Sequence, residues 1–203
     1  MIDLTTRDDV WRVTINRPEK ANSLTFQMLE SLTQIAQDAQ RARGFVITGI
    51  GSVFSAGADL EEAREGLAVS PIWEKLSSAI ADLPCLTIAA LNGTLAGGAM
   101  GMALACDIRL VVPNAKVFYP VMKLGFLPQP SDPKRMRALI GPARTKLILM
   151  GGQKISAQEA FQFGLVDRIC AQDELLEGVA EIIAGSAAAK PELASQIKQM
   201  CSD

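Results

Sequence analysis

Brief apolar runs alternate along the chain with longer segments in which apolar residues recur every three or four positions. The runs are short and rich in Val, Ile and Leu, which is typical of buried strands. We expect strands at Ile2–Thr5, Val10–Ile15, Phe45–Thr48, Leu86–Leu91, Ile108–Val112 and Leu165–Ile169. The longer spacing predicts helices over Thr25–Ala42, Leu60–Arg64, Ile72–Ala81, Gly98–Ala105, Glu174–Gly185 and Pro191–Met200. Strands that alternate with helices indicate an α/β fold.

Residues with capping chemistry mark several of the predicted helix ends. Thr25 is a natural N-cap, and Asp132 before Pro133 predicts a cap followed by proline at the first helical position. Ser156 and Glu159 have the spacing of a capping box, and Gly164 ends the helix that they begin.

One uncharged stretch, Leu83–Cys106, is long enough to span a bilayer. It contains Pro84, an Asn92–Gly93 turn and further glycines, which would break a continuous helix and leave backbone groups unsatisfied in lipid. We therefore expect a strand, a loop and a helix here, and no membrane partner.

Length and composition fit one globular unit. The chain has 203 residues, of which 49% are apolar and 21% are charged, and we expect a single domain over residues 1–203. Within it we expect a core over residues 1–170 and short C-terminal helices over 171–203. The formal net charge is −2 and no basic tract occurs, which argues against a nucleic-acid partner. The acidic N-terminus does not resemble a signal peptide, so we expect a cytoplasmic protein.

The chain contains no histidine. This excludes Ser-His-Asp and Cys-His catalysis and metal sites that use histidine. The four cysteines, Cys85, Cys106, Cys170 and Cys201, show no C-x-x-C spacing, so we expect no metal site. Three of them lie among apolar or small residues, as buried reduced thiols do.

Two segments, Phe45–Leu60 and Leu86–Ala105, each run from a strand through a glycine-containing loop to the start of a helix. Small residues let the backbone approach a ligand closely, and the first amides of a helix are free to donate. Two such loops over one pocket would aim two N–H groups at a single oxygen. That arrangement is an oxyanion hole, which stabilises charge developing on a carbonyl.

The same glycines also invite two other interpretations. A dinucleotide fingerprint fails because Phe54 occupies the position of the third glycine after Gly49 and Gly51, and no P-loop spacing occurs. The alternative that Gly97, Gly98 and Gly101 only permit close helix packing stays open on composition alone.

The loops closely resemble the crotonase superfamily, the enoyl-CoA hydratases and isomerases. Residues Phe54–Leu60 match the first signature of the family, and Asn92–Asp107 match the second. Asn16–Leu24 resembles the N-terminal stretch that ends near bound coenzyme A. Ile155–Ala160 and Gly164–Asp167 resemble the later helix and turn.

The resemblance implies a spiral of β-β-α units, followed by a mostly helical C-terminal part that is short for the family. It implies an acyl-CoA thioester as ligand, no further cofactor, and a homo-oligomer (a trimer or a dimer of trimers). By resemblance, the amides of Ala56 and Gly98 hold the thioester oxygen. The implied substrate contacts are Lys20, Ala21, Ala56, Gly57, Ala58, Asp59, Leu60, Gly97, Gly98 and Val121.

The sequence departs from the family at both catalytic acids. A hydratase of this family uses two glutamates, and their positions hold Gly101 and Val121 here. Losing a general acid–base group typically costs about 10²–10⁴ in rate. Isomerisation, hydrolysis or decarboxylation is therefore favoured over hydration. A non-catalytic acyl-CoA binding or scaffold protein is the alternative, and a purely structural subunit is a third.

Few residues offer a replacement acid. Asp132 lies on the loop after Pro128 that, by resemblance, borders the acyl pocket, but a helix N-cap before Pro133 is the favoured interpretation. For Glu61, Glu62, Glu65 and Lys123 a position on the solvated surface is favoured. For Tyr119, burial beside Phe118 is favoured.

Overall fold

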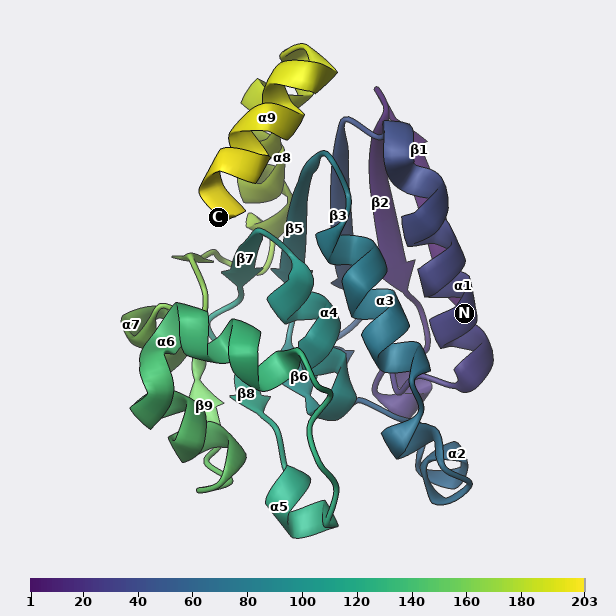
Figure 1. The fold of residues 1–203 in the computed structure, drawn as a ribbon, viewed down its shortest axis with the longest axis vertical. Helices are drawn as coiled ribbons and strands as arrows, with labels where there is room; N and C mark the ends of the chain where they lie inside the picture. The colour runs from purple at the N-terminus through teal and green to yellow at the C-terminus, as the bar shows by residue number, and fades with distance from the viewer. Residues whose placement is uncertain (203) are drawn as a thin grey trace.

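Six strands form a large sheet in the computed structural model, which describes residues 1–202 (Figure 1). Their spatial order is β1 (Ile2–Arg7), β2 (Val10–Ile15), β3 (Gly44–Gly49), β5 (Leu86–Leu91), β7 (Ile108–Val111) and β10 (Arg168–Ile169). β1 and β2 are antiparallel, and every other neighbouring pair is parallel. All six predicted strands are present, although the last shrinks from Leu165–Ile169 to two residues.

A two-residue turn joins β1 to β2. Arg7 pairs with Val10, and both residues between them, Asp8 and Asp9, have positive φ (51° and 58°). A hairpin of this length needs left-handed backbone, which aspartate tolerates better than most residues. β1 and β2 therefore form a tight hairpin.

The middle of the sheet is covered on both faces. Helices α1 (Phe26–Asp38), α3 (Ile72–Ala81) and α4 (Met100–Ala105) lie side by side in front of it, and α8 (Leu175–Ala188) packs behind against β3, β5 and β7 (Figure 1). Parallel strands covered on both faces are nearly continuous apolar runs. The almost fully buried β3 and β5 show this pattern.

A second, smaller sheet includes two strands, Val53–Ser55 and Thr94–Ala96, that lie in segments that we predicted as loops. Its spatial order is β4 (Val53–Ser55), β6 (Thr94–Ala96), β8 (Lys116–Phe118) and β9 (Ile155–Ser156). The chain passes from β3 to β4, from β5 to β6 and from β7 to β8, and each time continues into a helix. This repeat is the expected spiral of β-β-α units.

The remaining helices are α2 (Leu60–Arg64), α5 (Val121–Leu124), α6 (Asp132–Leu149), α7 (Ala157–Phe163) and α9 (Pro191–Ser202), with 3₁₀ turns η1 (Pro18–Lys20), η2 (Ala39–Arg41), η3 (Leu67–Val69) and η4 (Gly97–Ala99). Thr25 caps α1 by accepting the Met28 N–H at 3.2 Å, and the capping box of Ser156 is present. α6 is broken at Gly141, where φ is 74°.

The uncharged stretch Leu83–Cys106 folds as β5, β6, η4 and α4. Within residues 1–202, none of the helices is long and apolar enough to cross a membrane. Cys85, Cys106 and Cys170 are buried free thiols, as expected, and Cys201 is exposed.

Candidate functional site

Both glycine-containing loops open onto one cavity of about 610 Å³. It lies between the small sheet, α2, α3 and the segment around α5, and Trp73 and Tyr119 contribute to its walls. Most of the predicted ligand contacts line it: Ala21, Ala56, Ala58, Leu60, Gly97, Gly98 and Val121. Segments far apart in sequence thus meet where the resemblance expects the thioester.

The two loops touch through glycine. Gly57 has φ of 91°, and a Cβ atom placed on it would lie 3.0 Å from the Ala96 carbonyl oxygen and 3.3 Å from the Gly98 nitrogen. A side chain at position 57 would force the loops apart and strain the backbone. Glycine here is therefore a condition for bringing both helix starts to one cavity.

The pairing of the first loop with Leu24 leaves the N–H of Ala58 without an acceptor. The Leu24 N–H donates to the Gly57 carbonyl, and the Asp59 N–H donates to the Leu24 carbonyl, both at 2.8 Å. In a trans peptide the N–H points opposite to the preceding C=O. The Ala58 N–H therefore points away from Leu24, and no acceptor within residues 1–202 takes it.

The N–H of Gly98 is free for a different reason. Gly98 lies in the first turn of η4, where backbone N–H groups have no partner within the helix. Ala58 and Gly98 both line the cavity, so one free amide comes from each loop. Each loop thus brings a residue with an unpaired N–H to the wall of the same cavity.

The prediction for Ala56 needs correction. Its N–H donates to the Ala21 carbonyl at 3.1 Å, which pins the loop to the segment after η1. Ala56 lines the cavity, but its amide already has an acceptor. The free donor of this loop is Ala58, two residues further along.

Asp59 also has a role other than the predicted one. Its carboxylate pairs with Arg17 at 2.7 Å and caps α2 by accepting the Glu61 N–H at 3.1 Å. The hydrogen bond from the Arg17 guanidinium holds the pKa of Asp59 below its ordinary value. Asp59, Gly57 and the exposed Lys20 do not line the cavity. Asp59 therefore supports the first loop instead of facing a ligand.

Arg64, at the end of α2, is a cationic residue of the cavity wall that the sequence did not single out. Its exposed side chain provides positive charge there. The only signal in the sequence was a basic residue that closes the acidic helix.

Asn22 ties the first loop to the rest of the molecule. It is fully buried, accepts the Arg17 N–H at 2.8 Å, and donates to the Ile50 and Val53 carbonyls at 2.9 and 2.7 Å. We expect Asn22→Ala to lower the free energy of unfolding by about 2–3 kcal/mol, because buried backbone groups lose their partners. Urea denaturation measures this. Asn16→Ala, at a more exposed hydrogen bond to Asp3, is the control, and an equal loss in both variants would contradict the prediction.

Trp73 forms the wall beside the second loop. A Cβ atom on Gly98 would lie 3.2 Å from the indole ring, and the indole N–H donates to the Leu67 carbonyl at 2.8 Å. Because this rigid ring has to move, we expect Gly98→Ala to weaken acyl-CoA binding about tenfold, or roughly 1.4 kcal/mol, by calorimetry. Gly185→Ala, with no atom within 4 Å of the new carbon, should bind normally. Unchanged binding by Gly98→Ala would contradict this packing argument.

Asp132 is fully buried beside the cavity wall. Its Oδ2 accepts the Tyr119 hydroxyl at 2.9 Å, and its Oδ1 has no hydrogen-bond partner among the described residues. Burial raises the pKa of Asp132 to about 7. The N-cap interpretation is wrong, because Ser131 occupies the N-cap position and Asp132 is the first residue of α6.

The other acid candidates, at α2 and α5, lie away from Asp132 and Tyr119. Glu61, Glu65 and Lys123 are exposed, which agrees with a solvated surface. Glu62 accepts the Phe26 N–H at 2.6 Å and so joins α2 to α1. Tyr119, by contrast, is buried and lines the cavity.

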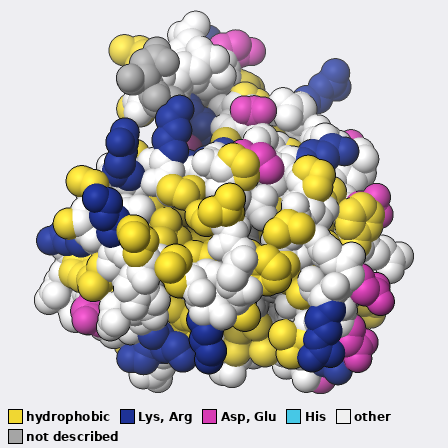
Figure 2. Space-filling model, turned by 60° about the horizontal axis from the view of Figure 1, so that its bottom comes forward, with side chains coloured by type: hydrophobic (Ala, Val, Ile, Leu, Met, Phe, Trp, Pro, Cys, Tyr) yellow, Lys and Arg dark blue, Asp and Glu magenta, His cyan; other side chains and the backbone are white. Residues whose placement is uncertain are grey.

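Apolar side chains surround the mouth of the cavity. Figure 2 turns the lower end of Figure 1 toward the viewer and shows hydrophobic side chains gathered on this face. The exposed ones that line the cavity are Leu60 (76%), Leu124 (57%), Phe126 (38%) and Leu127 (86%). Exposed apolar groups gathered in this way mark a ligand or partner surface.

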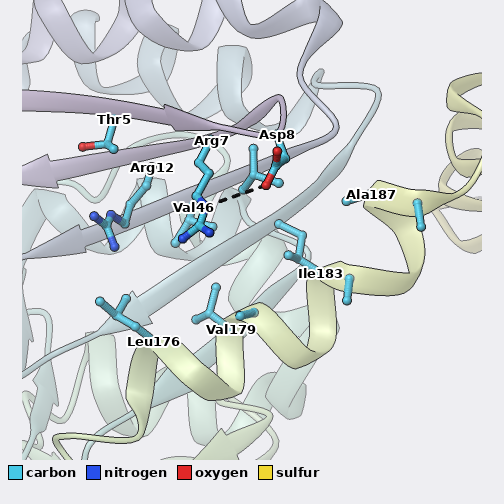
Figure 3. A pocket seen from close by; sticks show the side chains of 13 residues that line it. Thr5, Arg7, Asp8, Arg12, Val46, Leu176, Val179, Ile183 and Ala187 are labelled. Atoms are coloured by element: carbon cyan, nitrogen blue, oxygen red, sulfur yellow. Dashed lines mark ion pairs between the residues drawn. The ribbon is translucent and has the colours of Figure 1, made fainter.

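A second cavity, of about 590 Å³, lies between the β1–β2–β3 side of the large sheet and α8 (Figure 3). Arg7 and Arg12 face Leu176, Val179 and Ile183 of α8 across it, and Arg7 forms an exposed ion pair with Asp8 at 3.7 Å. Neither glycine-containing loop reaches this cavity. The first cavity is therefore the candidate site.

Comparison with known proteins identifies relatives of the whole chain. The family model described as Enoyl-CoA hydratase/isomerase matches residues 5–203. YngF of Bacillus subtilis, which carries the enoyl-CoA hydratase/isomerase name, is 35% identical over 196 aligned positions, covering 92% of this chain and 75% of that protein. Carnitinyl-CoA dehydratase of Salmonella typhi is 35% identical over 190 positions, covering 89% and 72%. An enoyl-CoA hydratase structure from Bacillus anthracis matches with a TM-score of 0.90 at 31% identity, covering 100% of this chain and 82% of that one. The predicted fold and the resemblance are confirmed.

Proposed function

The chain belongs to the enoyl-CoA hydratase/isomerase family, and from that premise we propose that it binds an acyl-CoA and acts on its thioester. In this proposal the N–H groups of Ala58 and Gly98 hold the thioester oxygen. The observation that carries the proposal is that a residue with a free N–H from each loop, Ala58 and Gly98, lines the same cavity.

The proposed chemistry depends on the negative charge that develops on the thioester oxygen. When a bond to the α-carbon of a thioester breaks and leaves its electrons behind, negative charge collects on the thioester oxygen. Each preorganised amide donor in a water-poor site is worth about 3–4 kcal/mol in the transition state. The cavity supports this because its lining is largely apolar.

The acyl chain, the pantetheine and the phosphates of the proposed ligand each have suitable residues in the cavity lining. Apolar residues such as Trp73 and Val121 favour an acyl chain, and Arg64 offers a cation to the coenzyme A phosphates. We assign the phosphate contact to Arg64 in place of Lys20, which lies outside the lining. Ala21 remains a proposed contact of the pantetheine.

Hydration by the two-glutamate route is disfavoured. Gly101 and Val121 carry no acid, and no histidine exists to replace one. Reactions that need a stabilised enolate or oxyanion and fewer acid–base groups fit better: isomerisation, hydrolysis or decarboxylation.

The test is incubation with a panel of saturated, 2-enoyl, 3-enoyl and malonyl-type CoA esters, with mass detection of the products. The expected result is conversion of at least one ester by a route other than addition of water to a double bond. Absence of turnover for every ester would overturn the enzymatic proposal.

A second candidate function rests on the same missing glutamates at Gly101 and Val121. A protein that only binds or presents acyl-CoA would need the cavity and the amides without any acid. Calorimetry combined with the panel separates the two candidates, because such a carrier binds an ester tightly and returns it unchanged. A purely structural subunit would bind no ester. A homo-oligomeric state and a cytoplasmic location stay predictions.

A further inference from the structure

A buried carboxylate and a phenol lie together at the inner end of the candidate site. Asp132 is 0% exposed and Tyr119 is 4% exposed, and the tyrosine hydroxyl donates to Asp132 Oδ2 at 2.9 Å. The second oxygen of Asp132 is buried without a hydrogen-bond partner among the described residues. A buried polar atom left unpaired is costly, so such an atom calls for an explanation.

The side chain missing at position 101 makes room for this carboxylate. A Cβ atom on Gly101 would lie only 2.9 Å from Asp132 Oδ1. Asp132 therefore occupies the space into which any larger residue at position 101 would project. Glycine at position 101 thus takes the place of the family's glutamate on the helix after the second loop. It also leaves room there for the carboxylate of Asp132 from α6.

This space lies about one helical turn from Gly98, whose N–H we propose as a donor to the thioester oxygen. Gly101 follows Gly98 by three residues in the continuous helical segment η4–α4, and residues at that spacing share one face of a helix, one turn apart. Tyr119 lines the same cavity as Ala58 and Gly98. A hydrogen-bonded path thus leads from the cavity wall through Tyr119 to Asp132.

We propose that Tyr119 and Asp132 form a proton-transfer pair for the α-carbon of the bound thioester, an assignment that rests on the proposed function above. The C–H bond at the α-carbon breaks and its proton goes to the Tyr119 oxygen, while the Tyr119 hydroxyl proton moves to Asp132 Oδ2. The electron pair of the C–H bond becomes the enolate, whose negative charge the amides of Ala58 and Gly98 hold. Reversal of the same steps returns the proton, to the same carbon or to another carbon of the chain.

The charges around the pair suit this exchange. Burial raises the pKa of Asp132 to about 7, the Tyr119 hydrogen bond and the charge of Arg135 lower it, and Glu74 raises it further. Burial and the neighbouring Asp132 carboxylate raise the pKa of Tyr119, so the phenol keeps its proton at neutral pH. A base whose pKa lies near the working pH is well matched to proton transfer.

Exchange of the α-hydrogens of butyryl-CoA in deuterated water tests the pair, because this saturated ester needs only enolate formation. Mass spectrometry follows deuterium uptake in the wild type, Tyr119→Phe and Asp132→Asn, and calorimetry measures how tightly each binds the ester. Asp173→Asn, an exposed aspartate away from the cavity, is the matched control.

We expect Tyr119→Phe and Asp132→Asn each to slow exchange by at least about 10²-fold while binding the ester as the wild type does. The wild-type rate should rise with pH and level off above about pH 7, as Asp132 ionises, and this rise should be absent in Asp132→Asn. A purely structural role for Asp132 would not remove the pH dependence.

The other outcomes are equally decisive. Unchanged exchange in Tyr119→Phe, with or without loss in Asp132→Asn, overturns the path through the tyrosine and leaves the proposed function standing. Binding without exchange by the wild type overturns the pair. Failure of the wild type to bind any CoA ester overturns the proposed function and the pair with it.

Discussion

Ala58→Pro is expected to lower turnover of the acyl-CoA substrate by about 10²–10³-fold, the usual effect of removing one oxyanion donor. Proline has no N–H, and the Ala58 N–H makes no hydrogen bond within residues 1–202 that the protein would lose. The preceding residue is Gly57, which lacks the Cβ that proline would crowd. Steady-state kinetics on the best ester from the CoA panel measure the effect, and circular dichroism checks the fold.

The matched control is Ala58→Gly, which removes the methyl group and keeps the N–H. It should retain most of the activity, because the donor is unchanged. If the proline variant turned over at the wild-type rate, the Ala58 amide would not be a donor to the thioester oxygen. Equal losses in both variants would point to the shape of the loop and not to its N–H.

Asp132→Asn is expected to stabilise the protein at neutral and alkaline pH, in contrast to its expected effect on proton transfer. The pKa of Asp132 rises on folding from an ordinary value of 3.8 to about 7, because the carboxylate loses its hydration. Between these two pH values the native state holds a proton that the unfolded state releases. Stability is therefore lost as pH rises from about 4 to about 7, by roughly 4 kcal/mol in total.

Urea denaturation of the wild type and Asp132→Asn, repeated from pH 4 to pH 8, measures this directly. The asparagine variant has no titrating group at position 132. Its gain in free energy of unfolding over the wild type should therefore be small at pH 4, grow toward pH 7 and then level off. The exposed Asp173→Asn should show no pH-dependent difference from the wild type. A constant difference across the whole range would mean that Asp132 is not buried as a titrating acid.

Strongly local signals predicted most of the fold. The apolar run Leu86–Leu91 became β5, and Thr25 capped α1, because both depend on residues within a few positions along the chain. The strands Val53–Ser55 and Thr94–Ala96 were missed. They are only three residues long and lie beside glycines, and they are strands because they pair with each other and, through Thr94–Ala96, with Lys116–Phe118.

In the candidate site, too, local features were predicted from the sequence and contacts between distant segments were not. The glycine-containing loops were identified from their local pattern, since a strand followed by glycine and a helix start implies free amides. Gly98 was named as the donor of the second loop by resemblance to the family. The donor of the first loop was placed on Ala56, although the free N–H belongs to Ala58. Nothing within Phe54–Leu60 distinguishes the two amides. The Ala56 N–H is taken by Ala21, and the pairing with Leu24 turns the Ala58 N–H away, and both of these residues lie far back in the chain.

By itself the sequence determined the alternation of the large-sheet strands with helices and the two close-approach loops, since each is written in neighbouring residues. Its resemblance to the family implied the β-β-α spiral and showed that the usual acids are absent. Tertiary structure alone decided which amide is free, that Asp59 pairs with Arg17, and that Asp132 meets Tyr119 in the space beside Gly101. The physical reason is that a hydrogen bond or a buried charge depends on the atom opposite it. That atom comes from a segment that only folding brings near.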